Sequence, residues 1–163
     1  MQFDIVIVGA GPAGSNLARL IGNQFKVLVI DKRSLTSREP SRIQKCCGGL
    51  LAPDAQKMMA KLGLGIPKEI LVNPQLFSVK TIDLNAHLER NYQRFYYNMD
   101  REAFDRWLVS LIPNTVQLHT SSIFKGYEPI DGGYFVEYTT HGQPRRATTK
   151  IIVGADGAMS RIR

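Results

Sequence analysis

The N-terminal part of the chain places a glycine-containing turn and a helical segment between two apolar runs. Residues 3–8 (FDIVIV) and 26–30 (KVLVI) are continuous runs rich in β-branched side chains, which is typical of parallel strands buried on both faces. Residues 12–21 predict a helix, with proline in its first turn and glycine just past its end. The order strand, helix, strand predicts a right-handed βαβ unit.

The middle of the chain predicts two more helices and some extended structure. Residues 100–111 carry apolar side chains at three- and four-residue spacing, and residues 53–62 are bounded by proline and glycine. Residues 76–84 and 94–97 favour extended structure, whereas residues 34–45 are polar and indicate a loop.

The C-terminal part predicts an antiparallel meander that leads into a final buried strand. Three short runs in which apolar and polar residues alternate cover residues 116–123, 134–140 and 147–150, and an Asp-Gly-Gly turn lies at 131–133. The last apolar run, residues 151–156 (IIVGAD), is expected to be followed directly by a helix. The whole pattern predicts an α/β fold with a central parallel sheet and a β-meander on one side.

Composition narrows the class of protein. The 163 residues are 44% hydrophobic and 21% charged, which suits one sizeable core. The net charge of +7 is spread along the chain without an aromatic-interleaved basic ribbon, so nucleic acid is not expected as a partner. An anionic ligand or a peripheral contact with a membrane surface fits this charge equally well. The apolar run at residues 3–10 is interrupted by Asp4 and is too short to span a membrane.

The reactive residue types are few and give no metal or triad pattern. The two cysteines, Cys46 and Cys47, are adjacent and form no disulfide framework, so a reducing cytoplasm is the expected compartment. The three histidines, His87, His119 and His141, are scattered and have no partner at the spacing of a catalytic triad or zinc site.

A glycine motif lies between the first strand and the first helix. Its residues are Gly9, Ala10, Gly11, Pro12, Ala13 and Gly14. Gly9 permits the tight turn, Gly11 lets the backbone approach a pyrophosphate, and Gly14 lets the helix pack closely on the strand. Asp31 closes the second strand, where it would accept hydrogen bonds from ribose hydroxyls, and Lys32 follows it. This context predicts a dinucleotide site at the helix N-terminus.

A second glycine-flanked carboxylate closes the last strand. Asp156 and Gly157 belong to a Gly-Ala-Asp-Gly segment, where a carboxylate can approach a ribose or ribityl hydroxyl closely. The alternative is a helix N-cap at Asp156 without a ligand.

These two motifs together resemble those of the flavoprotein hydroxylases, the p-hydroxybenzoate hydroxylase-like superfamily. The second motif matches at Asp156, Gly157, Ser160 and Arg163, and residues 98–108 resemble the family's Arg-x-x-Phe-Asp-x-x-Leu segment. The resemblance implies a Rossmann-like FAD-binding domain in which Arg101, Asp156 and Gly157 contact FAD. It also implies NAD(P)H as an electron donor.

One branch of that superfamily is a better match. Residues 45–50 (KCCGGL) resemble the Lys-x-Cys-Gly-Gly segment of the geranylgeranyl reductase family. The resemblance implies that Gly48 and Gly49 lie near the isoalloxazine and that Cys47 is the catalytic residue, near the reacting substrate. Arg42 falls where the superfamily often has an arginine that reaches the flavin. From the residues alone, Cys47 is either a reactive thiol or a small buried side chain.

Three functions remain open at this stage. The first is a flavoenzyme that reduces double bonds of a prenyl or similar hydrophobic substrate, and the second is an FAD monooxygenase that uses NAD(P)H and oxygen. The third is a truncated nucleotide-binding fragment without catalysis, because members of the resembled family are much longer. Residues 1–163 would then be an N-terminal FAD-binding part, and residues 71–97 would be an incomplete remnant of a substrate domain. Unpaired strands there would favour self-association.

Overall fold

The computed structural model describes residues 1–35 and 47–162, which form two compact units. The first unit combines residues 1–44 with 105–163, and the second unit comprises residues 45–104. Four residues singled out in the sequence, Arg42, Lys45, Cys46 and Arg163, lie outside the described ranges.

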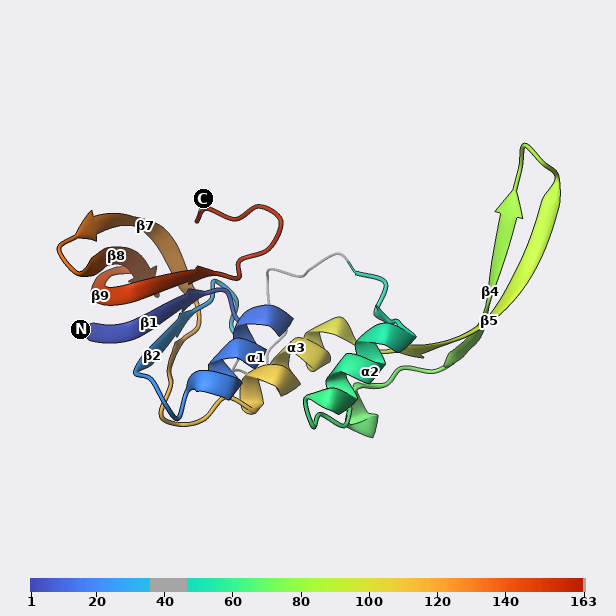
Figure 1. The fold of residues 1–163 in the computed structure, drawn as a ribbon, viewed down its shortest axis with the longest axis horizontal. Helices are drawn as coiled ribbons and strands as arrows, with labels where there is room; N and C mark the ends of the chain where they lie inside the picture. The colour runs from blue at the N-terminus through green and yellow to red at the C-terminus, as the bar shows by residue number, and fades with distance from the viewer. Residues whose placement is uncertain (36–46, 163) are drawn as a thin grey trace. The chain divides into compact units, whose positions relative to one another are not determined.

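The first unit is built on a sheet with the strand order β6-β2-β1-β9-β8-β7 (Figure 1). Its parallel part comprises β1 (Gln2–Val8), β2 (Val27–Ile30), β6 (Gln117–His119) and β9 (Gln143–Gly154). The antiparallel strands β7 (Ser122–Ile130) and β8 (Gly133–Thr140) extend from β9. The predicted α/β fold, with a parallel sheet and a β-meander, is therefore confirmed.

Both faces of β1 and β2 are buried, as their apolar runs predict, whereas the run of β9 at 151–154 contains no buried residue and the expectation of a buried final strand is wrong. Ile5, Ile7, Val27 and Val29 face a core that includes Ala18 of helix α1 (Pro12–Ile21) and Val109 of helix α3 (Arg101–Ser110). The alternate residues face a second core, beneath the meander. Its members are Phe3, Val6, Val8, Leu28, Ile30, Phe124, Val136, Tyr138 and Ala147. This division follows from the alternation of side chains along a strand.

The C-terminal strands differ from the sequence prediction in three ways. Residues 116–123 are not one strand, because the chain turns at Thr120 and Ser121 between β6, which pairs with β2, and β7. The third meander strand and the final apolar strand are one continuous element, β9. Residues 155–162 form turns and bends rather than the expected helix.

The second unit contains a small three-stranded sheet in the order β3-β5-β4. Strand β4 (Leu76–Asp83) and strand β5 (Leu88–Asn98) form a long ribbon (Figure 1), and β3 (Leu50–Leu51) pairs with the end of β5. Helix α2 (Pro53–Lys61) and the 3-10 turn η1 (Lys68–Ile70) complete the unit. The extended segment predicted at 94–97 is thus part of a longer strand, β5, most of whose residues are exposed.

Candidate functional site

The carboxyl ends of β1, β2 and β9 meet at one edge of the sheet, and the glycine turn lies there. The backbone N–H of Gly9 donates to the carbonyl of Ile30 (2.8 Å), and that of Ala155 donates to the carbonyl of Val8 (2.8 Å). The chain leaves β1 toward β2 on one side, and β9 flanks β1 on the other. Ligands of open α/β sheets bind in the crevice at such a reversal of strand order.

Two glycines of the turn are required by close contacts. Gly9 has a φ of +105°, and a Cβ added there would lie 2.3 Å from the carbonyl oxygen of Ala155. A Cβ added at Gly14 would lie 1.8 Å from the carbonyl oxygen of Gly9. No side chain larger than hydrogen fits at either position. Gly9 and Ala155 therefore bring the first glycine motif and the Gly-Ala-Asp-Gly segment into direct contact. The first residues of these two segments, Gly9 and Gly154, are 145 positions apart in the sequence.

The N-terminus of α1 has no negative charge of its own. Its N-cap is Gly11, which has no side chain to cap the helix, and its first turn contains no acidic residue. Pro12 occupies the first turn, as the sequence predicts. Because the N–H groups and dipole of such a terminus favour an anion, a phosphate or pyrophosphate fits here.

Asp31 lies at the end of β2 and is already hydrogen-bonded within the protein. Its Oδ2 accepts from the backbone N–H of Ala10 (2.7 Å), and its Oδ1 accepts from the backbone N–H of Arg33 (2.7 Å). The Arg33 guanidinium binds both oxygens and also donates to Asp105 of α3. The ribose contact of Asp31 stays a prediction, and a hydroxyl that reaches this carboxylate would share an oxygen with these donors.

Asp156 follows β9, beside the glycine turn. Its Oδ2 accepts from the backbone N–H of Arg161 (2.9 Å), whereas its buried Oδ1 has no hydrogen-bond partner among residues 1–35 and 47–162. Burial disfavours the charged form, but the nearby Ser160 hydroxyl, backbone N–H groups and the positive charge of Lys32 lower the pKa of Asp156 below its ordinary value. A buried, charged and unpartnered oxygen is suited to accept a ligand hydroxyl.

In the second unit, Cys47 and Arg101 lie together. The Arg101 Nη1 donates to the Cys47 Sγ at 3.8 Å, and Cys47 is exposed. The alternative of a small buried cysteine is therefore wrong. Gly49 has a φ of +70°, and a Cβ there would lie 2.2 Å from the carbonyl oxygen of Met99. Gly48 is exposed and has open space around it. Cation and thiol are arranged as in sites that favour a thiolate.

Sequence reasoning missed Arg33 and Asp105. Both are buried, with 5% and 1% of their surface exposed. Asp105 lies four residues before buried Val109, hence on the same face of α3. A carboxylate on the buried face of a helix requires a cation, and that position was the available signal.

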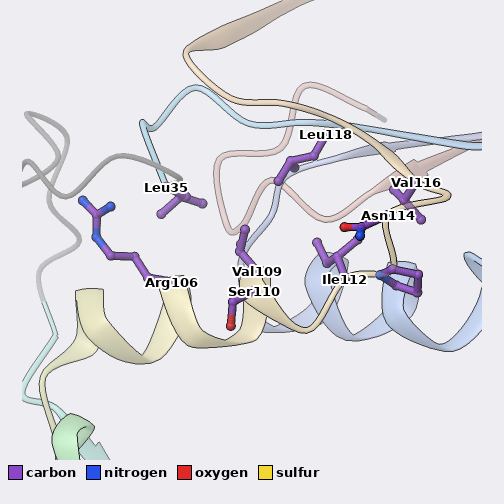
Figure 2. Close-up of a pocket in the computed structure, with 9 residues that line it drawn as sticks. Leu35, Arg106, Val109, Ser110, Ile112, Asn114, Val116 and Leu118 are labelled. Atoms are coloured by element: carbon purple, nitrogen blue, oxygen red, sulfur yellow. The ribbon is translucent and has the colours of Figure 1, made fainter.

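A separate open pocket of about 400 Å³ lies between α3 and β6 (Figure 2). Arg106 and Leu35 lie at one end of it, and Ile112, Asn114 and Val116 lie at the other. None of the predicted site residues lines this pocket.

Residues 1–35 and 47–162 contain no cluster of three or more metal-ligating side chains. None of the described helices combines the length and the hydropathy that crossing a bilayer requires.

Comparison with known proteins gives relatives by sequence and by fold. No family model matches the sequence. The protein CbrA of Escherichia coli K12 is 44% identical over 162 residues, which is 99% of this chain and 45% of that protein. The CbrA of Shigella sonnei has the same identity and coverage. The chain thus spans less than half the length of the curated relatives it matches.

Solved structures with a similar fold include several flavoproteins. A geranylgeranyl bacteriochlorophyll reductase-like protein from Thermoplasma acidophilum matches 96% of this chain and 39% of its own, with 19% identity and a TM-score of 0.77. A p-nitrophenol 4-monooxygenase from Pseudomonas putida matches 99% and 43%, with 17% identity and a TM-score of 0.75.

A myxobacterial chondrochloren halogenase, one of the FAD-dependent halogenases, matches 98% of this chain and 38% of its own, with 17% identity and a TM-score of 0.69. At these identities the likeness concerns the fold. The chain therefore has the α/β fold that flavin-dependent oxidoreductases, monooxygenases and halogenases share.

Proposed function

We propose that the first unit binds FAD at the edge where β1, β2 and β9 end. The observation that carries this proposal is the contact between the glycine turn and the segment that ends in Asp156, whose buried Oδ1 lacks a partner among the described residues. An uncapped helix N-terminus for a pyrophosphate and an unpartnered carboxylate oxygen for a hydroxyl stand at the same edge. The residues present therefore fit a flavin dinucleotide.

Each residue of the site would contribute binding or orientation. Gly9 and Gly14 would hold the turn closely packed, Gly11 would let the backbone approach the pyrophosphate, and Asp156 would accept a hydroxyl of the cofactor. Lys32, which is exposed and attracts Asp156, adds positive charge that favours the anionic dinucleotide. FAD, when bound, supplies the redox chemistry.

The longer protein to which such a chain belongs would be a flavin-dependent oxidoreductase that reduces a hydrophobic, prenyl-like substrate. The supporting features are the Lys-x-Cys-Gly-Gly resemblance at residues 45–50 and the exposed Cys47 with Arg101 beside it. Arg101 would stabilise negative charge on the sulfur, and Gly48 and Gly49 would leave room for a planar ring. NADH or NADPH would be the electron donor, and association with a membrane surface would give access to such a substrate.

The first test is flavin retention by the purified 163-residue chain. The chain is incubated with FAD and desalted, its visible absorption spectrum is recorded, and FAD affinity is measured by fluorescence titration. We expect saturable binding. A folded chain that shows no saturable binding of FAD would overturn the proposal.

Asp156→Asn tests the role of the carboxylate without a change of size. We expect FAD affinity to fall about 10- to 100-fold, because a hydrogen bond to a charged group contributes about 1.5–3 kcal/mol. The matched control is Asp131→Asn, which removes the same charge from an exposed turn. Equal affinity in the two variants would exclude the proposed contact.

A redox assay separates the reductase from a monooxygenase. The protein with FAD bound receives NADH or NADPH and a prenyl substrate, and products are identified by mass spectrometry. Saturation of a double bond supports the reductase, whereas oxygen consumption with hydroxylated product identifies a monooxygenase.

A further inference from the structure

Arg33 is a buried cation that links two elements of the first unit. Its guanidinium binds the Asp31 carboxylate through Nε (3.1 Å to Oδ1) and Nη2 (3.2 Å to Oδ2). Its Nη1 donates to the Asp105 carboxylate of α3. The side chains of Arg33 and Asp31 are each 6% exposed, and that of Asp105 is 1% exposed. A two-bond contact between guanidinium and carboxylate fixes orientation as well as distance.

The hydrogen-bonding capacity of Asp31 is fully used by two neighbours. Oδ1 accepts from the backbone N–H and Nε of Arg33, and Oδ2 accepts from Nη2 of Arg33 and from the backbone N–H of Ala10. An ionised carboxylate has about four acceptor positions. Three of the four donors belong to Arg33, so Arg33 determines how the carboxylate is oriented toward Ala10, which lies inside the glycine turn.

We propose that Arg33 is a positioning residue for dinucleotide binding. It transmits the position of α3 through Asp105 and Asp31 to the N–H of Ala10, and so holds the turn of residues 9–14 in the geometry that accepts a pyrophosphate. This inference rests on the proposed function, and it gives Asp31 a role in binding that needs no direct contact with the ligand.

The charges of the cluster favour arginine at this position. Two buried carboxylates close to each other repel, and Arg33 is the cation that lies between them. Burial disfavours the charged guanidinium, but its hydrogen bonds to Asp31 and then Asp105 raise the pKa of Arg33 above its ordinary value. Lysine has one compact ammonium group and cannot bind both oxygens of Asp31 while it also reaches Asp105.

The test compares Arg33→Met, Arg33→Lys and Asp105→Asn with the matched control Arg146→Met. Arg146 pairs with Glu137 at the surface, and its side chain is 71% exposed, so the control removes the same charge without touching the cluster. We expect FAD affinity to fall about 10- to 100-fold in Arg33→Met, as when a partner that orients a binding group is lost. Arg33→Lys should recover part of this loss, and Arg146→Met should stay within about twofold of the wild type.

A second readout reports the turn itself. The amide proton of Ala10 donates to a carboxylate at 2.7 Å, and its ¹H resonance should move upfield in Arg33→Met and in Asp105→Asn as this bond lengthens. A general loss of packing would shift resonances throughout the sheet. The expected shift is confined to residues 9–15 and 31–33.

The outcomes separate this inference from the proposed function. A folded Arg33→Met chain with wild-type FAD affinity, or with an unchanged Ala10 resonance, overturns the positioning role. If the wild-type chain binds no FAD, the proposed function fails, and the Ala10 resonance alone then decides whether Arg33 sets the turn. If Arg33→Met does not fold, Arg33→Lys and Asp105→Asn are measured in the same way, and unchanged values in both overturn the inference.

Discussion

Substitution of Gly14 by alanine tests the close packing on which the proposed FAD site depends. The added Cβ would lie 1.8 Å from the carbonyl oxygen of Gly9 and 3.2 Å from the Cβ of Ala155. Contacts of real Cβ atoms are essentially never shorter than 3.0 Å. Both the Cβ and the carbonyl are fixed to the backbone, so no side-chain rotation relieves the clash. The start of α1 must move away from the turn.

The size of the effect follows from this displacement. Overpacking a close contact costs about 1–3 kcal/mol. For a chain of this length, that loss lowers Tm by roughly 3–9 °C. Because the turn and the helix N-terminus move apart, FAD affinity should fall as well. This fall should be seen even at temperatures where the variant is fully folded, so loss of stability alone does not explain it.

Thermal unfolding by circular dichroism and FAD titration well below Tm measure the two effects separately. Gly126→Ala is the matched control, because Gly126 belongs to the same unit and a Cβ there meets nothing within 4 Å. We expect its Tm within about 2 °C of the wild type. If Gly14→Ala matches Gly126→Ala in both Tm and FAD affinity, the contact at Gly14 is not required and the reasoning is refuted.

Two further predictions concern titration and thiol reactivity. Burial and then the charge of Arg145 lower the pKa of His119 below its ordinary value of 6.5. The contribution of His119 to the free energy of unfolding is therefore fully present above about pH 6.5 and is lost as the pH falls through its folded pKa. An NMR titration that gives a pKa above 6.5 contradicts this, and His119→Gln should flatten the loss of stability on acidification. In a Cys46→Ser background, Arg101→Met should slow alkylation of Cys47 at pH 7.5, because the cation beside Sγ favours the thiolate. The two rates should converge near about pH 10, where the thiol is ionised in either case, and equal rates at pH 7.5 would count against the role of Arg101.

The βαβ unit and the glycine turn could be predicted because their signals are local. Residues 5–8 and 27–30 are apolar without interruption, and both belong to strands buried on two faces. Proline at the start and glycine after the end of α1 determine its limits, and the structure gives the same range, 12–21. Asp31 and Asp156 are also placed at strand ends, where the motifs predict them.

The connection between β6 and β7 could not be predicted, because it depends on tertiary pairing. Residues 116–123 alternate without a turn signal, yet β6 pairs with β2 while β7 pairs with β8 at the other end of the sheet. Ser121 turns with a φ of +49°, a conformation that glycine favours and serine seldom adopts. The backbone N–H groups of Ser121 and Ser122 donate to the carbonyls of Arg33 and Asp31, which stabilises this turn through residues remote in sequence.

The cluster of Asp31, Arg33 and Asp105 was missed for the same reason. Arg33 follows a strand in a polar stretch, where an exposed side chain is the ordinary expectation. Its burial depends on Asp105, which is 72 positions away. The local sequence pattern does not reveal which cation pairs with Asp105. It shows only that a carboxylate lies on the buried face of α3 and therefore requires a cation from another part of the chain.

The position of β1 between β2 and β9 has a consequence for the synthesis of the protein. Gln2 pairs with Thr148, and Val8 pairs with Gly154. A ribosome that adds about 5–20 residues per second makes β9 roughly 7–30 s after β1. During this interval the nascent chain can form β1, α1 and β2, but one edge of β1 has no partner strand. The N-terminal segment must therefore stay protected from aggregation until β9 has been made, and its dependence on chaperones should exceed that of a sheet built from neighbouring strands.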